Sequence, residues 1–334
     1  MKKDLETWHF ISEQLRGGQP VMLLVVAESS GSSPGRAGYK MAVAVDGSLC
    51  GSIGGGVMEV DLVERCRILL SAADSESVLP QIIEQVHQKN SPHASGMICS
   101  GQEKVILRML SSGDIDTISD VIAASKKSDD RRLVISPSQF ELRQATGDLP
   151  SVLFEQRQDN DFIYSERIET SGRLFIIGGG HCALALSEVM ERLGFQISIF
   201  DDRPDLNTIE KNRFADSVTI VETYENVAEF VPSGDEVYIV VMTLGYLSDQ
   251  VVVRCLLGRD VRYFGVLGSR AKVETMFREL RNEGLDETRL NSIDSPIGIS
   301  INSHTPEEIA ISIAAEIISV KNGAARLPLA SGNG

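Results

Sequence analysis

The fold of this chain is decided by one stretch of its second half, Arg173-Leu174-Phe175-Ile176-Ile177-Gly178-Gly179-Gly180-His181-Cys182-Ala183. Four of its first five residues are apolar, which predicts a short buried strand. Gly178 and Gly180 follow in a G-x-G-x-x-A arrangement, and residues 184–193 then have the apolar spacing of a helix. A strand, a glycine turn and a helix in this order predict the start of a nucleotide-binding α/β domain.

The residue types in this turn suit contact with a nucleotide. Gly178 permits the tight turn, Gly180 lets the backbone approach a pyrophosphate, and Ala183 lets the helix pack close to the strand. Residues 196–200 predict the next strand, and Asp201 at its end, 23 positions after Gly178, is placed to bind a ribose hydroxyl. The alternative is a doubly wound fold that keeps the turn for packing alone.

Three further residues near the turn are candidates for nucleotide contact. His181 either faces the nucleotide or only decorates the N-terminus of the helix, whose free N–H groups suit phosphate. Asp202 beside Asp201 favours a free ribose hydroxyl over a 2′-phosphate, whereas Arg203 leaves room for the phosphate.

Bulk composition excludes several classes of protein. The length of 334 residues suits two domains, and the hydrophobic share of 42% suits real cores. A net charge of −15 argues against a nucleic-acid groove. The five cysteines form no C-x-x-C pair, which favours reduced thiols and a cytoplasmic protein. The N-terminal residues read as amphipathic rather than as a signal peptide, and no apolar run approaches the roughly 20 residues that cross a membrane.

The patterning predicts an α/β fold, with an N-terminal α/β domain and a C-terminal Rossmann-like, doubly wound parallel sheet. The expected boundaries are 1–126 for the first domain, 127–171 for a linker with extra β elements, 172–325 for the nucleotide-binding domain, and 326–334 for a tail. In the first domain we expect helices at 4–17, 57–71, 76–89 and 113–126, and strands at 21–27, 39–45, 48–53 and 104–110.

The second half alternates strand and helix, which indicates a parallel sheet. After the first two strands we expect strands at 217–221, 236–242 and 262–266, and helices near 248–257 and 270–283. The last helix has a clear start, because Thr305, Pro306 and Glu308 form a capping box with proline in the first turn. It is expected to run to about Lys321.

Three loops of the first domain carry candidate ligand residues. The first, residues 29–38, supplies Ser32, Ser33 and Arg36, and Lys40 lies just beyond it. Ser/Gly/Pro loops are also common as plain turns. Lys40 is the residue expected to reach back toward these loops from its strand.

The second loop contains Gly54, Gly55 and Gly56 before a helix, an arrangement of N–H groups that suits an anion. Glu59 follows in the first helical turn, where the helix dipole also favours a carboxylate for structural reasons. The third loop holds Cys99, either a thiol that reacts with metal or sulfur or a small core residue.

At these residues the chain resembles the xanthine dehydrogenase accessory factor family (XdhC/CoxI). The resemblance covers roughly residues 20–110 and 172–322, in the order of the family. Its main motifs are Gly31-Ser32-Ser33-Pro34, Gly51-Ser52-Ile53-Gly54-Gly55-Gly56-Val57-Met58-Glu59, Cys99-Ser100-Gly101, Ile177-Gly178-Gly179-Gly180-His181 with Phe200-Asp201-Asp202-Arg203, Tyr263-Phe264-Gly265-Val266-Leu267-Gly268-Ser269-Arg270, and Thr305-Pro306-Glu307-Glu308-Ile309-Ala310.

The resemblance implies a maturation factor for molybdenum hydroxylases. Such a protein binds molybdenum cofactor of the molybdopterin type, protects it while its terminal sulfur is installed, and delivers it to the apo molybdenum hydroxylase. The implied partners also include a cysteine desulfurase and a second copy of the chain in a homodimer. A cofactor-binding chaperone is therefore expected rather than a turnover enzyme.

The sequence departs from the family pattern in three places. Gly35 follows the proline where arginine is frequent, with Arg36 one place later. Ser100 stands in the middle of the Cys-Gly-Gly element, and the Thr243-Leu244-Gly245-Tyr246 segment lacks the histidine that the family often has. These departures are consistent with a subgroup that serves another hydroxylase or another form of the cofactor.

The resulting hypothesis assigns the loops at 31–38 and 54–56 to the phosphorylated end of the cofactor and Cys99 to its molybdenum. Arg36 or Lys40 close by would lower the pKa of that thiol. The C-terminal half would bind a nucleotide, either part of the cofactor or a separate NAD(P) or ATP-like ligand.

Two rivals remain, an NAD(P)-dependent oxidoreductase and a nucleotide-binding regulator without catalysis. The first needs a proton donor near the nicotinamide, for which Tyr246, Tyr263 and Lys272 are the candidates.

Overall fold

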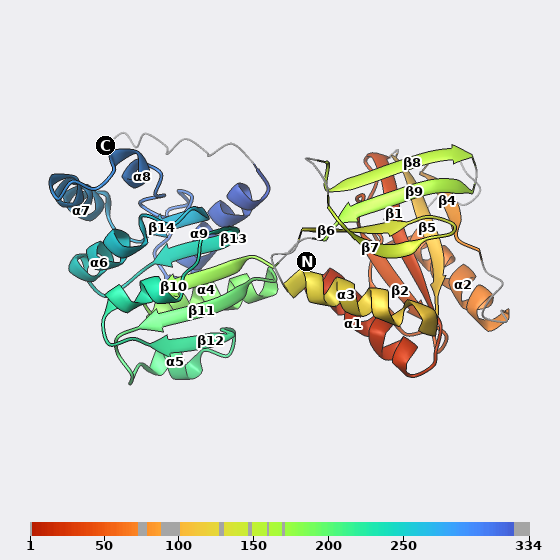
Figure 1. Cartoon of the computed structure of the whole chain (residues 1–334), viewed down its shortest axis with the longest axis horizontal. Helices are drawn as coiled ribbons and strands as arrows, with labels where there is room; N and C mark the ends of the chain where they lie inside the picture. Colours follow the sequence, from red (N-terminus) through yellow and green to blue (C-terminus); the bar gives the residue numbers. More distant parts are fainter. Residues whose placement is uncertain are drawn as a thin grey trace. The chain divides into compact units, whose positions relative to one another are not determined.

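The computed structural model describes residues 2–72, 79–87, 101–126, 130–145, 149–158, 160–168 and 171–323. The chain divides into two compact units, an N-terminal unit of Met1–Thr170 and a C-terminal unit of Ser171–Gly334 (Figure 1). Both units combine sheets with helices, and the C-terminal sheet is parallel, so the predicted fold class is confirmed. Among the described residues, no helix has both the length and the apolar character needed to cross a membrane.

The N-terminal unit is built on a five-stranded antiparallel sheet with the order β3-β2-β1-β5-β4. Its strands are β1 (Val21–Gly31), β2 (Lys40–Ala44), β3 (Leu49–Gly51), β4 (Gln81–His87) and β5 (Gly101–Leu110). Side chains alternate between the two faces of β1, as the period of a strand requires. Val21, Leu23 and Val25 enter one core, and Met22 and Leu24 enter the other.

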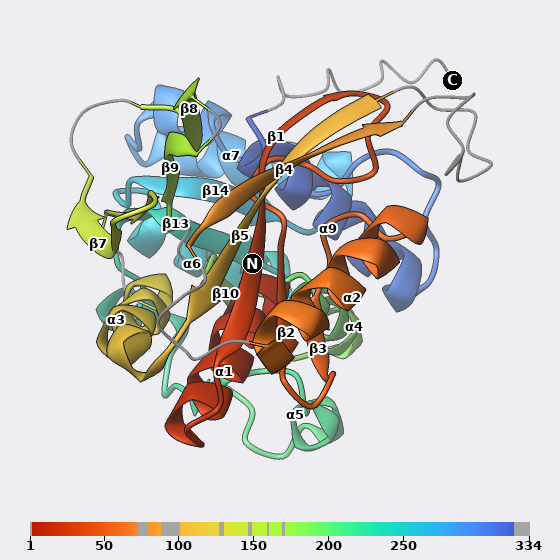
Figure 2. The same ribbon diagram turned by 90° about the vertical axis from the view of Figure 1, so that its right-hand side faces the viewer.

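Three helices cover the two faces of this sheet: α1 (Lys2–Arg16), α2 (Val57–Ala72) and α3 (Ile115–Lys126), the last after a 3-10 turn at Ser112–Asp114. Apolar residues of α1 and α3 pack on the face of Val21, and those of α2 pack on the face of Met22. Figure 2 shows α2 and α3 on opposite sides of the strands. This division explains why all of residues 21–27 are buried.

A second sheet occupies much of the region for which a linker is predicted. Its four antiparallel strands have the order β7-β6-β9-β8, with β6 at Arg131–Ile135, β7 at Phe140–Gln144, β8 at Val152–Gln158 and β9 at Asp161–Arg167. Leu133, Phe162 and Tyr164 share a core with α1, α3 and β1. The described strands of this region are therefore an integral part of the N-terminal unit, and the linker assignment for them is corrected.

The helix predicted at 76–89 is also wrong where the structure describes it. β4 pairs antiparallel with β5, from Gln81 opposite Leu107 to His87 opposite Gly101. Ile82 and Ile83 pack against opposite cores, which only a strand allows for adjacent residues. Pairing with a long neighbouring strand overrides the weak helical pattern.

The C-terminal unit has a five-stranded parallel sheet with the order β12-β11-β10-β13-β14. Its strands are β10 (Arg173–Ile177), β11 (Gln196–Asp201), β12 (Ser217–Ile220), β13 (Gly234–Val241) and β14 (Val261–Val266). Helices α4 (His181–Arg192) and α9 (Pro306–Lys321) pack on one face, and α6 (Tyr246–Leu256) and α7 (Arg270–Asn282) pack on the other. The short elements are α5 (Asn207–Lys211), a 3-10 helix at Tyr224–Glu229, and α8 (Glu287–Asn291).

The strand order of this sheet reverses beside β10. The chain passes from β10 outward through β11 and β12, then returns to place β13 on the other side of β10. In open parallel sheets, ligands bind where the order reverses, outside the carboxyl ends of the strands. The loops after β10 and β13 therefore mark the expected binding crevice of the C-terminal unit.

Candidate functional site: the glycine turn and the N-terminal loop cluster

The turn after β10 is held tightly against the end of β13. Gly178 has φ of 109°, and a Cβ at this position would lie 2.3 Å from the carbonyl oxygen of Met242. Its N–H donates to the carbonyl of Phe200 at 2.8 Å, which ties the turn to β11 as well. Only glycine fits this backbone, in agreement with the role assigned to it from the sequence.

Gly180 leaves the start of α4 open. It is the N-cap residue of α4 and provides no side-chain cap to the first-turn N–H groups. A Cβ at Gly180 would meet no atom within 4 Å, and the adjacent His181 is exposed. The backbone here can therefore be approached closely by a phosphate, and the helix dipole favours a negative charge.

Asp201 lies at the end of β11 and is fully buried, yet it is ionised. Its Oδ2 accepts the N–H of Gly179 at 2.6 Å, and the Arg203 guanidinium forms a bidentate pair with both oxygens at 2.8 Å. Burial alone would raise the pKa of this carboxyl, but the hydrogen bonds from Arg203 and from Gly179 outweigh it and hold the pKa below the ordinary value of 3.8.

Asp202 points elsewhere than its neighbour. Its Oδ1 accepts the hydroxyl of Tyr224 at 3.1 Å and lies 3.8 Å from Nε of Arg203. Burial, followed by the nearby charges of Asp201 and Asp202, raises the pKa of Tyr224 well above its ordinary range, so the hydroxyl remains a donor.

A second pair of buried acid and cation lies beyond β13, and sequence reasoning missed the pairing. Asp249 of α6 is fully buried, and its Oδ1 accepts both the N–H and the hydroxyl of Thr243, at 3.0 and 2.6 Å. Its Oδ2 lies 2.7 Å from Nζ of Lys272, a side chain that is 29% exposed. The pair fixes Lys272 at the same edge of the sheet as the glycine turn, where it remains accessible.

The other proton donor proposed for an oxidoreductase is not accessible. Tyr263 is 1% exposed, and its hydroxyl donates to Glu316 of α9. The N–H of Gly298 donates to the same carboxylate oxygen at 2.9 Å. This tyrosine therefore links β14 to α9 and is not placed to act on a ligand.

In the N-terminal unit, three loops converge at one end of the sheet. A Cβ at Gly35 would lie 2.2 Å from the carbonyl oxygen of Ile53, and one at Gly54 would lie 2.5 Å from the nitrogen of Gly35. A Cβ at Gly101 would lie 2.6 Å from the nitrogen of Ser33. The loop at 31–38, the glycine loop at 51–56 and the start of β5 are therefore in direct backbone contact, and we call them the loop cluster.

Two carboxylates hold this cluster together. The buried Glu103 of β5 accepts the hydroxyl of Ser33 and, at 2.7 Å, the N–H of Gly35. Glu59 of α2 uses one oxygen to accept the Ser52 hydroxyl and the N–H groups of Ile53 and Gly55, at 2.8, 2.9 and 3.0 Å. The anion predicted for the glycine loop is thus supplied at these two N–H groups by the protein itself.

Lys40 belongs to a buried network rather than to the open side of the cluster. Its Nζ lies 2.7 Å from Oε2 of Glu166 in β9, and both side chains are 6% exposed. Nζ also donates to the carbonyl of Gly38, and the hydroxyl of Tyr164 donates to the same Glu166 oxygen at 2.7 Å. Burial, then the charge of Glu166, raises the pKa of Tyr164, so this hydroxyl stays protonated.

The structure thus separates the predicted residues into groups. Ser32 and Arg36 are exposed on the loop cluster, while Ser33 and Lys40 are buried in hydrogen bonds and ion pairs. Cys99, predicted to contact molybdenum, lies outside the described residues. Within the residues that are described, no group of three or more His, Cys, Asp or Glu side chains is arranged to hold a metal ion.

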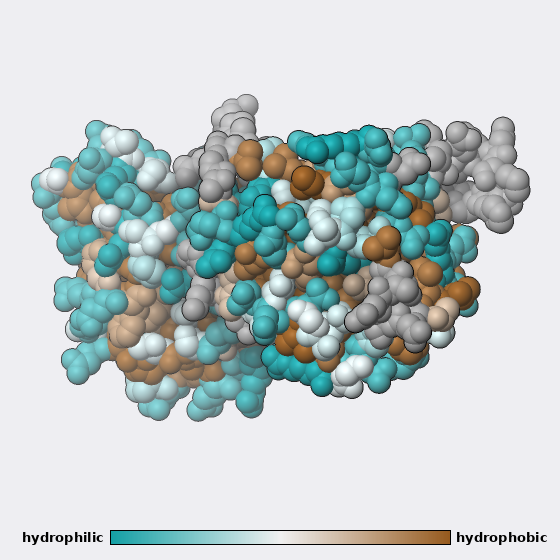
Figure 3. Space-filling view, turned by 45° about the vertical axis from the view of Figure 1, so that its right-hand side comes forward, coloured by the Kyte–Doolittle hydropathy of each residue, from teal (hydrophilic) through white to brown (hydrophobic). Residues whose placement is uncertain are grey.

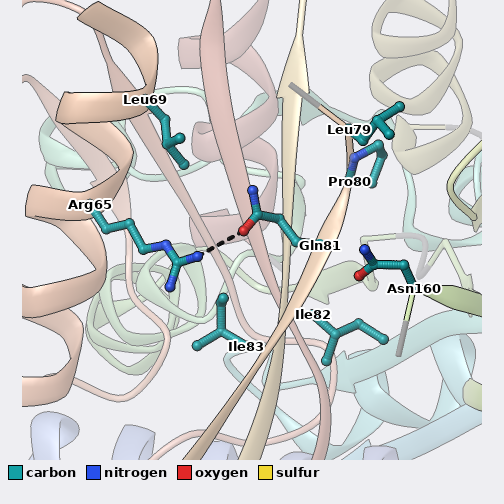
Figure 4. Close-up of a pocket in the computed structure, with 8 residues that line it drawn as sticks. All are labelled: Arg65, Leu69, Leu79, Pro80, Gln81, Ile82, Ile83 and Asn160. Carbon is teal, nitrogen blue, oxygen red and sulfur yellow. Dashed lines mark hydrogen bonds between the residues drawn. The ribbon is translucent and has the colours of Figure 1, made fainter. Parts of the chain in front are cut away.

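A surface pocket of about 430 Å³ lies away from these residues (Figure 4). It is lined by α2, β4 and the turn before β9, and Nη2 of Arg65 donates to Oε1 of Gln81 at 2.9 Å across it. None of the predicted ligand residues lines the pocket. Figure 3 shows hydrophobic and hydrophilic residues interspersed over the face that it draws.

The architecture defines a protein with a Rossmann-like C-terminal unit and an N-terminal α/β unit that gathers its glycine loops at one sheet end. Residues 174–317 match the XdhC Rossmann domain, and residues 14–79 match the XdhC and CoxI family. The chain belongs to the XdhC and CoxI family, as its sequence motifs indicate.

Two curated relatives resemble the chain. The uncharacterized protein YqeB of Escherichia coli (strain K12) is 26% identical over 308 residues, which are 91% of this chain and 44% of YqeB. A probable xanthine dehydrogenase component of Bacillus subtilis (strain 168) is 28% identical over 159 residues, 48% of this chain and 46% of that protein. The chain therefore spans less than half the length of either relative.

A crystal structure described as a xanthine dehydrogenase from Bacillus halodurans shares the fold. Its TM-score is 0.74 at 23% identity, over 97% of this chain and 98% of that one. The likeness extends over both units and agrees with the assignment of the family.

Proposed function

We propose that this chain is an accessory factor of the XdhC type that receives molybdenum cofactor as cargo. It would protect the cofactor while the terminal sulfur is installed and pass it to an apo molybdenum hydroxylase. Membership of the XdhC and CoxI family supports the accessory role. The name of the Bacillus subtilis relative supports a client of the xanthine dehydrogenase class.

The observation that carries the binding role is the open N-terminus of α4. Gly180 supplies no cap and no Cβ, so the first-turn N–H groups are available to a phosphate oxygen. We assign this position to the phosphate or pyrophosphate of a nucleotide. The reversal of strand order beside β10 supports the same position on topological grounds.

The loop cluster is the second part of the proposal. Its exposed residues Ser32 and Arg36 offer a hydroxyl and a guanidinium to an anion, and a side chain at Gly55 would meet no atom within 4 Å. Glu59 and Glu103 act as fixed supports for these loops rather than as ligands. Cys99, two residues before Gly101 in the sequence, is assigned the soft sulfur contact to molybdenum.

A change at Gly180 separates binding from folding. Aspartate is a good N-cap residue, so Gly180→Asp should preserve or slightly improve α4 while placing a carboxylate where the phosphate would bind. The matched control is Gly258→Asp, at an exposed glycine between α6 and β14 where a Cβ also meets open space.

Both variants would be purified from cells that make molybdenum cofactor, and bound molybdenum and pterin would be measured. We expect cofactor in the wild type and in Gly258→Asp and little in Gly180→Asp. Equal loading of all three proteins would refute the assignment of the phosphate to α4.

The role of Cys99 needs its own test. Cys99→Ser should retain the pterin yet fail to support sulfuration of the cofactor and activation of the apo-hydroxylase. Cys50→Ser changes a partly exposed thiol in β3 of the same unit and should behave as wild type. Normal activation by Cys99→Ser would remove the thiol from the mechanism.

We also propose a cysteine desulfurase as a partner and a homodimer as the working form, both implied by the family. Light scattering of the purified chain gives its mass in solution directly. Binding of the desulfurase is measured with the chain immobilised, with and without cofactor.

One specific observation favours the oxidoreductase as a second candidate. Lys272 is held by Asp249 at the edge of the sheet where a nicotinamide would lie, and its ammonium can donate a proton. Oxidation of NADPH or NADH with a panel of carbonyl substrates tests this candidate. Turnover abolished by Lys272→Met would favour it over the carrier.

A further inference from the structure

The oxygens of Asp201 are fully occupied by the chain itself. Oδ1 accepts the backbone N–H and Nε of Arg203, and Oδ2 accepts the N–H of Gly179 and Nη2 of Arg203. Each carboxylate oxygen has two lone pairs, so four donors exhaust its capacity. The side chain is also 0% exposed. A ribose hydroxyl therefore cannot hydrogen-bond to Asp201 unless the ion pair with Arg203 is broken first.

Arg203 has donors left over. Its side chain is 33% exposed, and its contacts with Asp201 engage Nε and Nη2 only. Among the described residues, Nη1 has no hydrogen-bond partner. A guanidinium held on one edge by a carboxylate offers a pre-oriented fork on its other edge, and this fork matches a phosphate.

The position of Arg203 in the fold identifies which phosphate it would meet. It follows the end of β11 by two residues, and Asp201 connects it directly to Gly179 in the glycine turn. In folds of this kind the ribose next to the pyrophosphate lies beside the end of the second strand, and an arginine there accommodates a 2′-phosphate.

We propose that the C-terminal unit selects a dinucleotide whose ribose carries a 2′-phosphate over one with free hydroxyls, through Arg203. This inference rests on the proposed nucleotide site at α4. It replaces the expectation that Asp201 and Asp202 favour a free hydroxyl, because Asp201 supports the arginine instead of the sugar. The nucleotide is then a ligand separate from any cargo whose ribose is unphosphorylated.

Asp202 opposes the phosphate, which provides an additional test. It lies 3.8 Å from Nε of Arg203 and is 42% exposed, so its charge would repel a bound phosphate. Asp202→Asn should therefore tighten binding of the phosphorylated nucleotide and leave binding of the other nearly unchanged.

The experiment is calorimetric titration of the full chain with NADP⁺ and with NAD⁺. We expect NADP⁺ to bind at least about tenfold more tightly, the ratio that one charge-assisted bidentate contact provides. Arg203→Ala should bring the ratio near one with NAD⁺ affinity largely kept. Arg254→Ala, which removes a similar bidentate pair with Glu283 between α6 and α7, should keep the wild-type ratio.

The outcomes distinguish the two proposals. If the wild type binds NAD⁺ as tightly as NADP⁺ or more tightly, the selectivity is refuted while the nucleotide site stands. If neither nucleotide binds, the proposed site at α4 fails and the selectivity fails with it. The wild-type ratio alone decides the inference if Arg203→Ala does not fold.

Discussion

The Asp201 carboxylate and the Arg203 guanidinium form a bidentate ion pair at the end of β11, with Nη2 2.8 Å from Oδ2 and Nε 2.8 Å from Oδ1. The N–H of Gly179 completes the set of donors, so one buried acid fixes both the glycine turn and the arginine. This relationship makes Asp201 a structural residue of the crevice, and it determines what Arg203 can offer to a ligand.

Replacing Asp201 should cost stability in a way that depends on pH. Asp201→Asn leaves Arg203 without its charged partner, and we expect a loss of about 1–3 kcal/mol in the free energy of unfolding at pH 7. Because the pKa of Asp201 is lowered in the folded state, its contribution is present above about pH 4 and is lost as the pH falls through the lower folded value.

Urea unfolding at pH 7 and at pH 3 measures this effect. The difference between wild type and Asp201→Asn should narrow at the lower pH, whereas Asp235→Asn, at an exposed position of β13, should match wild type at both. A difference that is as large at pH 3 as at pH 7 would contradict the lowered pKa.

The glycine loop should loosen without Glu59. Glu59→Ala removes the acceptor of three hydrogen bonds, and we expect faster amide exchange at Ile53 and Gly55 with a loss of about 1–2 kcal/mol in stability. Glu64→Ala removes an exposed carboxylate from the same helix, which forms only a surface pair with Arg67. Unchanged exchange at Ile53 and Gly55 would show that the loop holds itself.

The buried pair of Lys40 and Glu166 should behave as one unit. Glu166→Leu alone leaves the Lys40 ammonium buried without this carboxylate, and we expect a loss of about 3 kcal/mol. Lys40→Met combined with Glu166→Leu should cost less than Glu166→Leu alone, because both charges are removed together. Thermal and urea unfolding of the single and double variants measure the coupling, and strictly additive losses would argue against it.

Cys66 should be inert in the native protein. It is fully buried on α2, and burial raises its pKa to about 12. At pH 8 the thiolate fraction is then on the order of 10⁻⁴, so alkylation by iodoacetamide should require unfolding. Peptide mapping by mass spectrometry, with Cys66→Ala as the reference, measures this, and rapid native labelling would indicate that α2 opens.

Local sequence is sufficient for features that depend on neighbouring residues. The capping box at the start of α9 is confirmed, since Thr305 accepts the N–H of Glu308 and Glu308 accepts the N–H groups of His304 and Thr305. The glycine turn at Gly178 is confirmed for the same reason, because its geometry is dictated by a tight backbone contact. The parallel arrangement of the C-terminal sheet follows from the alternation of strand and helix.

Features that depend on distant partners cannot be read from the sequence. Ser33 meets Glu103 and Lys40 meets Glu166, and nothing within a short window of the chain indicates either pairing. Glu59 is a candidate from its position in the first helical turn, yet only the folded loop shows that it accepts N–H groups expected to bind an external anion. The strand β4 is not predicted because its identity depends on β5.

The two acid–cation pairs at the edge of the parallel sheet have a kinetic consequence. Arg203 and Lys272 are each neutralised by an aspartate, so the crevice carries little net positive charge within a chain of net charge −15. An anionic nucleotide would therefore approach against a repulsive long-range field, and added salt would screen that repulsion. Association should speed up with ionic strength, the reverse of what a basic binding surface produces.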